Sequence, residues 1–312
     1  MSSDAAAALI TEPFLVALRE ICDLSPLAEA ELLITGWGCP PLDESTLDAA
    51  PLLRAVMHTA GSVRGHITEA CWERGIEVSS AASVNALPVA EYTLATILLS
   101  GKHVLERSRE YRSARQPPGN WLHTPAHVGN YRKTVGILSA SMTGRRVIEL
   151  LRPFDFQVLL YDPYVSEKDA VALGVRTVSL AELFAHSDIV SVHAPLLPAT
   201  EGLVSRGLLA TMRPSSVLIN TARGAIVDQD ALTEVLCEGQ IRAVLDVTEP
   251  EILPPDHPLW TCDNALLTPH VAGSQGNEWQ RLTELAITEI RRWAAGDGFA
   301  HPVKRERLAF LA

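Results

Sequence analysis

The sequence predicts an α/β fold in which a doubly wound parallel sheet is combined with a second, smaller α/β domain. Short runs of Val, Ile and Leu alternate with amphipathic stretches, which is the pattern of βαβ units. The 312 residues suffice for about two domains of roughly 150 residues each. Six of the strand-like runs follow one another in the middle of the chain, which is enough for one complete sheet.

The expected elements follow in chain order. We expect buried strands at Leu32–Ile34, Arg54–His58, Thr134–Leu138, Gln157–Tyr161, Ile189–His193, Val217–Asn220, Ala243–Asp246 and Ala265–Thr268. Helical patterns lie at Thr143–Leu151, Asp230–Cys237, from Pro88 towards Arg107, and from about Asn277 to Ala295. Pro88 suits the first turn of a helix, where its missing N–H costs nothing. The aperiodic segment Arg115–Gly129 predicts a loop.

The segments on either side of the central strands are too short to fold comfortably alone. Residues 88–273 contain the six strands, so residues 1–87 and 274–312 remain. We expect these two flanks to pack together as a discontinuous second domain. The ligand site is then expected in the cleft between the domains.

Composition excludes several classes of function. The 26 Lys and Arg against 37 Asp and Glu give a net charge of −11, which argues against nucleic acid or an anionic membrane as partner. The five cysteines are odd in number and form no CxxC pair, which favours reduced thiols in a cytoplasmic enzyme. The start, MSSDAAAALITEPF, lacks the basic region of a signal peptide.

Neither a membrane segment nor a metal site is expected. The longest apolar stretch, Leu94–Ser100, is far shorter than the roughly 20 residues that a membrane helix needs. His123 and His127 lie four residues apart but have no Cys or carboxylate partner at ligand spacing.

A turn at residues 134–144, TVGILSASMTG, predicts a nucleotide site. Ser139, Ser141 and Gly144 occupy the three positions of a GxGxxG turn, and only the third is Gly. The N-terminus of the following helix supplies N–H groups and a positive dipole for a pyrophosphate whatever the turn residues are. Asp162 ends the next strand, 18 residues after Gly144. A carboxylate there binds ribose hydroxyls and repels a 2′-phosphate, so NAD is favoured over NADP.

Three further strand ends carry candidate catalytic residues. Arg223 follows the strand Val217–Asn220, Glu249 and Glu251 follow Asp246, and His270 follows Thr268. Carboxyl ends of parallel strands meet at one edge of a sheet, so these side chains could converge. Each alone has a plain structural explanation: a surface turn for the Arg, a solvated loop for the Glu and a core position for the His.

Together, an Arg, a Glu and a His suit the interconversion of 2-oxo and 2-hydroxy acids. A guanidinium clamps a carboxylate through two hydrogen bonds. An imidazole can move the proton at the C2 oxygen, since its reference pKa lies near 6.5. A carboxylate bonded to the other ring nitrogen orients the imidazole.

The chain resembles the D-isomer-specific 2-hydroxyacid dehydrogenases, which include phosphoglycerate dehydrogenases and glyoxylate/hydroxypyruvate reductases. The similarity covers nearly the whole chain and rests on six segments in family order: NALPVAEYTLATILL, TVGILSASMTG, SVHAPLLPATEGLV, INTARGAIVD, VLDVTEPE and LLTPHVAG. It implies a Rossmann NAD-binding domain inserted in a flavodoxin-like substrate domain, and a homodimer formed through the nucleotide domain.

The resemblance also implies roles for individual residues. Arg223 corresponds to the carboxylate-binding arginine and His270 to the acid/base. Glu251 corresponds to the acid that orients the histidine, because the family glutamate lies five residues after the aspartate of the LDV segment; Glu249 is the competing interpretation. Ile252 replaces the proline that usually follows this glutamate.

The cofactor and substrate contacts are carried over in the same way. The expected NAD contacts are Ser139, Ser141, Met142, Thr143, Gly144, Asp162, His193, Pro195, Thr221, Ala222 and Asp246. Among these, Asp246 would bind the nicotinamide carboxamide, and Thr221 and Ala222 would contact the nicotinamide through their backbone. The family's substrate loop corresponds to Ala60, Gly61, Ser62 and Val63, whose backbone N–H groups would bind the substrate carboxylate.

Two functions remain open at this point. The first is an NAD-dependent enzyme acting on a small 2-oxo or 2-hydroxy acid. The second is a non-catalytic NAD-sensing or interaction protein on the same scaffold. The complete Arg, Glu and His set favours the enzyme, and the loss of two turn glycines favours the alternative.

Overall fold

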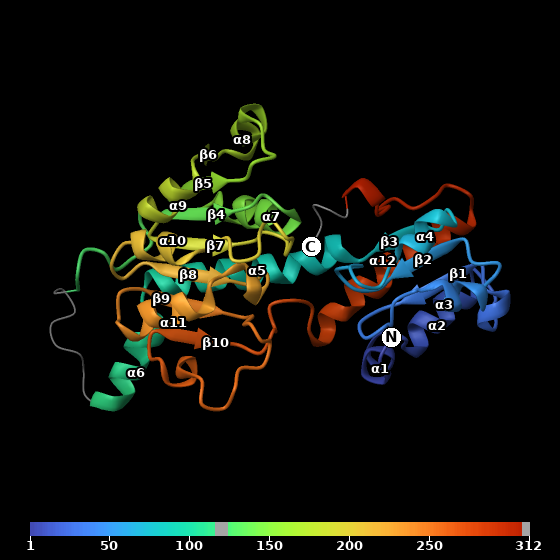
Figure 1. Cartoon of the computed structure of the whole chain (residues 1–312), viewed down its shortest axis with the longest axis horizontal. Coiled ribbons are helices and arrows are strands. Elements are labelled where there is room, and N and C mark those ends of the chain that lie inside the picture. The colour runs from blue at the N-terminus through green and yellow to red at the C-terminus, as the bar shows by residue number, and fades with distance from the viewer. Residues whose placement is uncertain (116–123, 308–312) are drawn as a thin grey trace. The chain divides into compact units, whose positions relative to one another are not determined.

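The chain divides into two compact units, shown in Figure 1. The computed structural model describes residues 1–115 and 124–307, so His123 and most of the expected loop at 115–129 lie outside the described residues. Unit 1 comprises Met1–Pro88 and Gly273–Ala312, and unit 2 comprises Val89–Ala272. These bounds lie one residue from the domain boundaries expected from the sequence.

Unit 2 contains a seven-stranded parallel sheet. Its strand order is β10 (Ala265–Leu267), β9 (Arg242–Leu245), β8 (Val217–Asn220), β7 (Ile189–Val192), β4 (Thr134–Leu138), β5 (Gln157–Tyr161) and β6 (Arg176–Thr177). The first strand of this sheet in the sequence, β4, therefore lies in its interior. β5 and β6 follow on one side of β4, and β7, β8, β9 and β10 follow on the other. This reversal places the ligand-binding edge at the carboxyl ends of β4 and β7, and it confirms the doubly wound fold.

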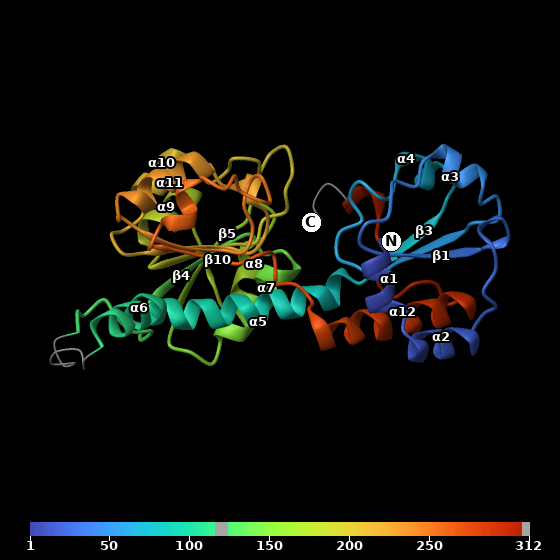
Figure 2. The ribbon, with the colours of Figure 1, turned by 90° about the horizontal axis from the view of Figure 1, so that it is seen from below.

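Helices cover both faces of this sheet (Figure 2). One face carries α5 (Ala82–Gly101), which is followed by α6 (Val104–Ala114), together with α7 (Met142–Leu151) and α8 (Glu167–Leu173). The other carries α9 (Leu180–His186), α10 (Arg206–Thr211) and α11 (Gln229–Cys237). Each face has its own buried core, with Ile97 and Val147 on the first and Phe184 and Leu232 on the second.

Unit 1 is built around a three-stranded parallel sheet. Its strands lie in the order β1 (Leu32–Thr35), β2 (Ala55–His58) and β3 (Glu77–Ser80). One face packs on α1 (Ser3–Leu9), α2 (Glu12–Arg19) and α12 (Trp279–Ala294), and the other on α3 (Glu44–Asp48) and α4 (Glu69–Glu73). The last helix thus returns to the unit formed by the first 88 residues.

The structure corrects the expected helix from Pro88 towards Arg107. Helix α5 already begins at Ala82, so Pro88 lies inside it, and the chain breaks at His103 (φ 53°) before α6. A proline inside a helix costs about 3 kcal/mol, which burial of the flanking Ala86 and Ala90 helps to offset. Two strands were also missed: β3, and β6, whose two exposed residues give no hydrophobic signal.

Helix α5 is long and apolar enough to cross a membrane by length and composition alone. Polar residues such as Glu91 interrupt this helix. Its unbroken apolar stretches are therefore short, although its mean hydropathy is high. The core helix of a soluble protein passes the same test, and Ala90, Thr93 and Ile97 are fully buried in unit 2.

The tight packing of β4 makes a matched pair of glycine substitutions informative. A Cβ on Gly136 would lie less than 3.0 Å from the hydroxyl of Ser187. On Gly207 in α10, the one described atom that a Cβ would meet is the Ser205 hydroxyl, 3.9 Å away. We expect Gly136→Ala to lower the free energy of unfolding by about 1–3 kcal/mol through overpacking. Gly207→Ala should leave it equal or raise it by up to about 1 kcal/mol. Urea unfolding measures both, and equal midpoints would contradict this packing.

Candidate active site

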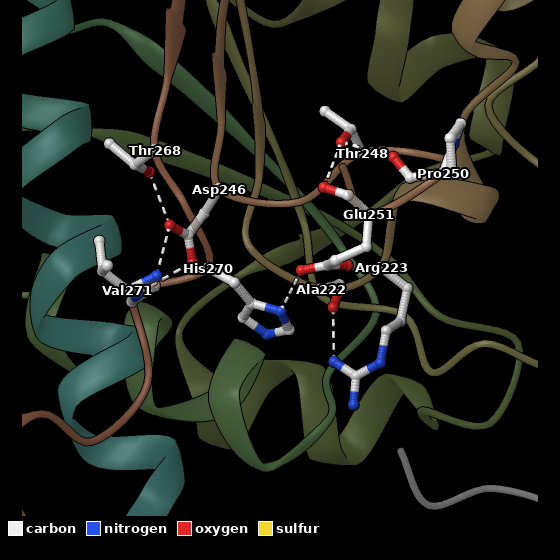
Figure 3. Close-up of polar contacts among 10 residues, drawn as sticks. Ala222, Arg223, Asp246, Thr248, Pro250, Glu251, Thr268, His270 and Val271 are labelled. Atoms are coloured by element: carbon white, nitrogen blue, oxygen red, sulfur yellow. Dashed lines mark hydrogen bonds and ion pairs between the residues drawn. The ribbon is translucent and has the colours of Figure 1, made fainter. Parts of the chain in front are cut away.

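Three loops at the carboxyl ends of β8, β9 and β10 bring the predicted catalytic side chains together (Figure 3). His270 Nδ1 lies 2.6 Å from Glu251 Oε1, and both side chains are about half exposed. The backbone of Glu249 is instead held by Gln229. Its N–H donates to Gln229 Oε1 at 2.8 Å, and its carbonyl accepts from the side-chain amide of Gln229. Glu251 is therefore the partner of the histidine.

The buried carboxylate of Asp246 holds the segment that carries His270. Asp246 is 1% exposed and accepts hydrogen bonds from Thr268 Oγ1 at 2.6 Å, Val271 N at 2.9 Å and Ala272 N at 2.8 Å. Its backbone carbonyl accepts from the N–H of His270, whose φ of 54° is left-handed. Tyr92 supports the arrangement through a 2.8 Å hydrogen bond to Thr268 Oγ1. The sequence did not indicate this positioning role, and the expected nicotinamide contact stays a prediction.

The Arg223 turn is fixed by two neighbours that the sequence analysis missed. The Asn220 side chain accepts from Ala222 N at 3.0 Å and donates to the carbonyl of Arg223 at 2.9 Å. Gly224 packs on the Thr248 backbone so closely that a Cβ would lie less than 3.0 Å from it. The sequence signal for this turn is an Asn at the end of a strand, Asn220, with a Gly four residues later, Gly224.

The guanidinium of Arg223 is partly buried beside Glu251. Its Nη1 donates to the carbonyl of Ala222 at 2.6 Å. Burial lowers the pKa of Arg223, and the nearby Glu251 charge counteracts this effect. An arginine stays protonated under such conditions, so the site combines one fixed cation with an imidazole–carboxylate pair.

The SxSxxG turn follows β4 and is tied to Asp162. Ser139 has a φ of 80°, so it adopts the left-handed backbone that a glycine normally supplies there. Its hydroxyl donates to Asp162 Oδ2 at 3.1 Å, and Ala140 N donates to the same oxygen at 2.8 Å. Tyr164 N donates to Oδ1 at 2.8 Å. A carboxylate has about four acceptor sites, so one remains for a ribose hydroxyl.

The N-terminus of α7 lies at this turn and fits a pyrophosphate. Gly144 must be glycine, because a Cβ would lie less than 3.0 Å from the carbonyl of Ser139. Ser141 caps the helix by accepting from Gly144 N at 3.2 Å, and Met142 and Thr143 follow in its first turn. The helix dipole and free N–H groups, with the acidic Asp162, are the donor and acceptor set that NAD requires.

The remaining expected cofactor residues lie at neighbouring strand ends. His193 follows β7 and is fully buried, with Nε2 2.9 Å from Ser191 Oγ; burial lowers the pKa of His193 to about 3. Pro195 comes two residues later. Thr221 and Ala222 follow β8, where Thr221 Oγ1 lies 3.2 Å from Thr93 Oγ1. These hydrogen bonds lie within the chain and do not test the NAD contacts expected of these residues. Those contacts stay predictions.

The expected substrate loop belongs to unit 1 and follows β2. Ala60 and Val63 are buried, whereas Gly61 and Ser62 are partly exposed. Among the described residues, the amides of Gly61, Ser62 and Val63 donate no hydrogen bond within the chain. The expected contact of this loop with the substrate carboxylate stays a prediction.

Comparison with known proteins identifies the family. The model of the D-isomer specific 2-hydroxyacid dehydrogenase NAD binding domain matches residues 94–272, which lie within unit 2. The chain belongs to this family. A glyoxylate reductase from Thermofilum pendens is 34% identical over 303 residues, covering 90% of this chain and 88% of the relative.

Two further relatives show how far the similarity extends. D-3-phosphoglycerate dehydrogenase from Methanocaldococcus jannaschii is 28% identical over 277 residues, which are 88% of this chain but only 52% of that enzyme. The chain therefore spans about half the length of this relative. The structure of D-lactate dehydrogenase from Aquifex aeolicus, complexed with NAD and lactic acid, is 25% identical with a TM-score of 0.74, covering 94% of this chain and 97% of that one.

The Ser139–Asp162 hydrogen bond predicts an effect on cofactor affinity. Ser139→Gly removes a Cβ beside the pyrophosphate position and frees an acceptor on Asp162, so we expect NADH to bind several-fold more tightly. Ser139→Ala keeps the Cβ in a left-handed conformation and loses the hydrogen bond, so it should show a smaller gain and lower stability by about 1 kcal/mol. Tryptophan fluorescence during NADH titration measures both. Weaker binding by Ser139→Gly would show that the hydroxyl assists the cofactor.

The buried His193 predicts a loss of stability in acid. Because its pKa is about 3 in the folded chain and near 6.5 when unfolded, the unfolded chain binds the extra proton between these values. The free energy of unfolding should therefore fall as pH falls from 6.5 towards 3, by about 2 kcal/mol at pH 5 from this group. Urea unfolding of His193→Gln should show a shallower pH dependence than the wild type. Equal slopes would contradict a neutral His193.

Proposed function

We propose that the protein is an NAD-dependent oxidoreductase that interconverts a 2-oxo acid and a D-2-hydroxy acid. The observation that carries this proposal is the His270–Glu251 pair beside Arg223, at the strand ends of a domain whose family binds NAD. The names of the relatives, glyoxylate reductase, phosphoglycerate dehydrogenase and lactate dehydrogenase, support a small 2-oxo acid as substrate. Cytoplasmic location and a homodimer stay predictions.

Each residue of the site has a definite task in this reaction. Arg223 binds the substrate carboxylate through its guanidinium. NAD, when bound, carries the hydride that is exchanged with C2. In reduction, protonated His270 donates its proton to the C2 oxygen; in oxidation, neutral His270 accepts it. Glu251 fixes the ring through Nδ1, which leaves Nε2 for the substrate.

Cofactor binding is the first point to test. Titration of the purified protein with NADH and NADPH, followed by tryptophan fluorescence, should show saturable binding of NADH in the micromolar range and weaker binding of NADPH because of Asp162. Turnover is then measured with glyoxylate, hydroxypyruvate and pyruvate. Binding of NADH without turnover of any 2-oxo acid would favour the non-catalytic alternative. Absence of binding at millimolar NADH by a folded protein would contradict the enzyme and favour a non-enzymatic role.

The acid/base role of His270 gives a direct prediction. We expect His270→Gln to lower kcat by about 10²–10⁴-fold, the usual range for general acid–base catalysis, with NADH affinity little changed. His186→Gln, at the exposed end of α9, is the matched control and should retain wild-type kcat. Steady-state kinetics with the 2-oxo acid that is turned over fastest measures kcat of both variants. Near-normal turnover by His270→Gln would refute the assignment.

A further inference from the structure

An arginine of α7 contacts the nucleotide turn that precedes its own helix. Arg145 lies in the first turn of α7 and is exposed. Its Nε donates a hydrogen bond to the carbonyl of Ala140 at 2.9 Å. The side chain therefore reaches back past Ser141, the N-cap of the helix, and joins the helix to the turn.

Two charged side chains hold the backbone of Ala140 between them. Its N–H donates to Asp162 Oδ2 at 2.8 Å, and its carbonyl accepts from Arg145. Within residues 1–115 and 124–307, Arg145 is the one donor to this carbonyl. The peptide group between Ala140 and Ser141 is therefore held in its orientation by the Arg145 side chain.

This contact sets the direction of one amide at the N-terminus of α7. The peptide between Ala140 and Ser141 is trans, and in a trans peptide the C=O and the N–H point in opposite directions. A carbonyl directed at the guanidinium of Arg145 therefore directs the N–H of Ser141 away from it. Among the described residues, none accepts a hydrogen bond from this N–H. It precedes the amides of Met142 and Thr143 in the first turn of α7, where a helix binds a pyrophosphate.

The positive charge of Arg145 is a second contribution, which can be separated from the hydrogen bond. A pyrophosphate is negatively charged, so a nearby cation favours its binding. Arg145 is exposed, however, and water and salt screen an exposed charge strongly. We therefore expect the hydrogen bond to the Ala140 carbonyl to have the larger effect.

We propose that Arg145 is a positioning residue of the cofactor site, which holds the Ala140 carbonyl so that the Ser141 N–H, together with the amides of Met142 and Thr143, is directed at the pyrophosphate of NAD. This inference rests on the proposed function, of which it uses the binding of NAD alone. Arg145 contacts the nucleotide turn rather than the acid/base pair. Its loss should therefore weaken NADH binding and leave the chemical step at saturating NADH unchanged.

Two substitutions of Arg145 isolate the hydrogen bond from the charge. Gln carries its amide nitrogen on Cδ, as Arg carries Nε, so Arg145→Gln keeps a donor for the Ala140 carbonyl and loses the charge. Met has a methyl group at this position, so Arg145→Met loses both. Gln and Met are both good helix formers. We expect Arg145→Met to raise Kd for NADH by about three- to tenfold, the range for one net hydrogen bond. Arg145→Gln should stay within about twofold of the wild type.

Arg146→Met is the matched control, because it removes the same charge from the next position of α7. Arg146 donates to Glu149 Oε2 at 2.6 Å, a contact within the helix. Its loss should change Kd for NADH by less than about twofold. Kd is measured by tryptophan fluorescence during NADH titration of the full chain. Urea unfolding of each variant, with a midpoint close to that of the wild type, shows that the change is confined to the site.

Steady-state kinetics supply a second readout that a general loss of structure would not reproduce. With the 2-oxo acid that is turned over fastest, Arg145→Met should raise KM for NADH by the same factor as Kd. Its kcat at saturating NADH should equal that of the wild type, because the acid/base pair is untouched.

The outcomes separate this inference from the proposed function. A wild type that binds NADH but turns over no 2-oxo acid refutes the proposed enzyme, and the titrations still decide the inference. A folded wild type that binds no NADH refutes both. If the wild type binds NADH, an unchanged Kd in Arg145→Met refutes the inference alone. Equal effects of Arg145→Met and Arg145→Gln, or of Arg145→Met and Arg146→Met, also overturn it.

Discussion

The candidate active site depends on one buried carboxylate. Asp246 lies at the end of β9 and binds the hydroxyl of Thr268 and the amides of Val271 and Ala272, while its backbone holds the amide of His270. A buried charge is tolerated only when its acceptor sites are occupied. The hydrogen bonds that occupy the acceptor sites of Asp246 therefore also fix the turn at His270. This turn places Nδ1 of His270 within hydrogen-bond distance of Glu251.

Close backbone packing supplies the second constraint. Gly224 lets the Arg223 turn pack on Thr248 in the loop that carries Glu251, and Gly144 lets α7 pack on the end of β4. In both places a Cβ would overlap with backbone, which cannot move aside as a flexible side chain could. The two glycines thus couple the catalytic residues and the nucleotide turn to the sheet itself. The first position of that turn is different, because Ser139 adopts the left-handed backbone and uses its hydroxyl to bind Asp162.

Most strands of unit 2 were predictable because they are buried on both faces. Fully buried parallel strands contain continuous runs of apolar residues, and Thr134–Leu138 and Val217–Asn220 have the predicted bounds. β6 was not predictable, since its two residues are exposed. Local rules also failed at Pro88, where packing around α5 outweighs the preference of proline for a helix start.

By itself, the sequence determined the fold class, the family and the identity of the candidate site residues, because residue type and spacing along the chain express hydrophobic periodicity and motif order. Only the tertiary structure decided that Glu251 rather than Glu249 contacts His270, and that Asp162 is bound by Ser139. The physical reason is that a hydrogen bond depends on distance and direction in space, and two carboxylates separated by one residue differ in neither charge nor chemistry until the chain folds.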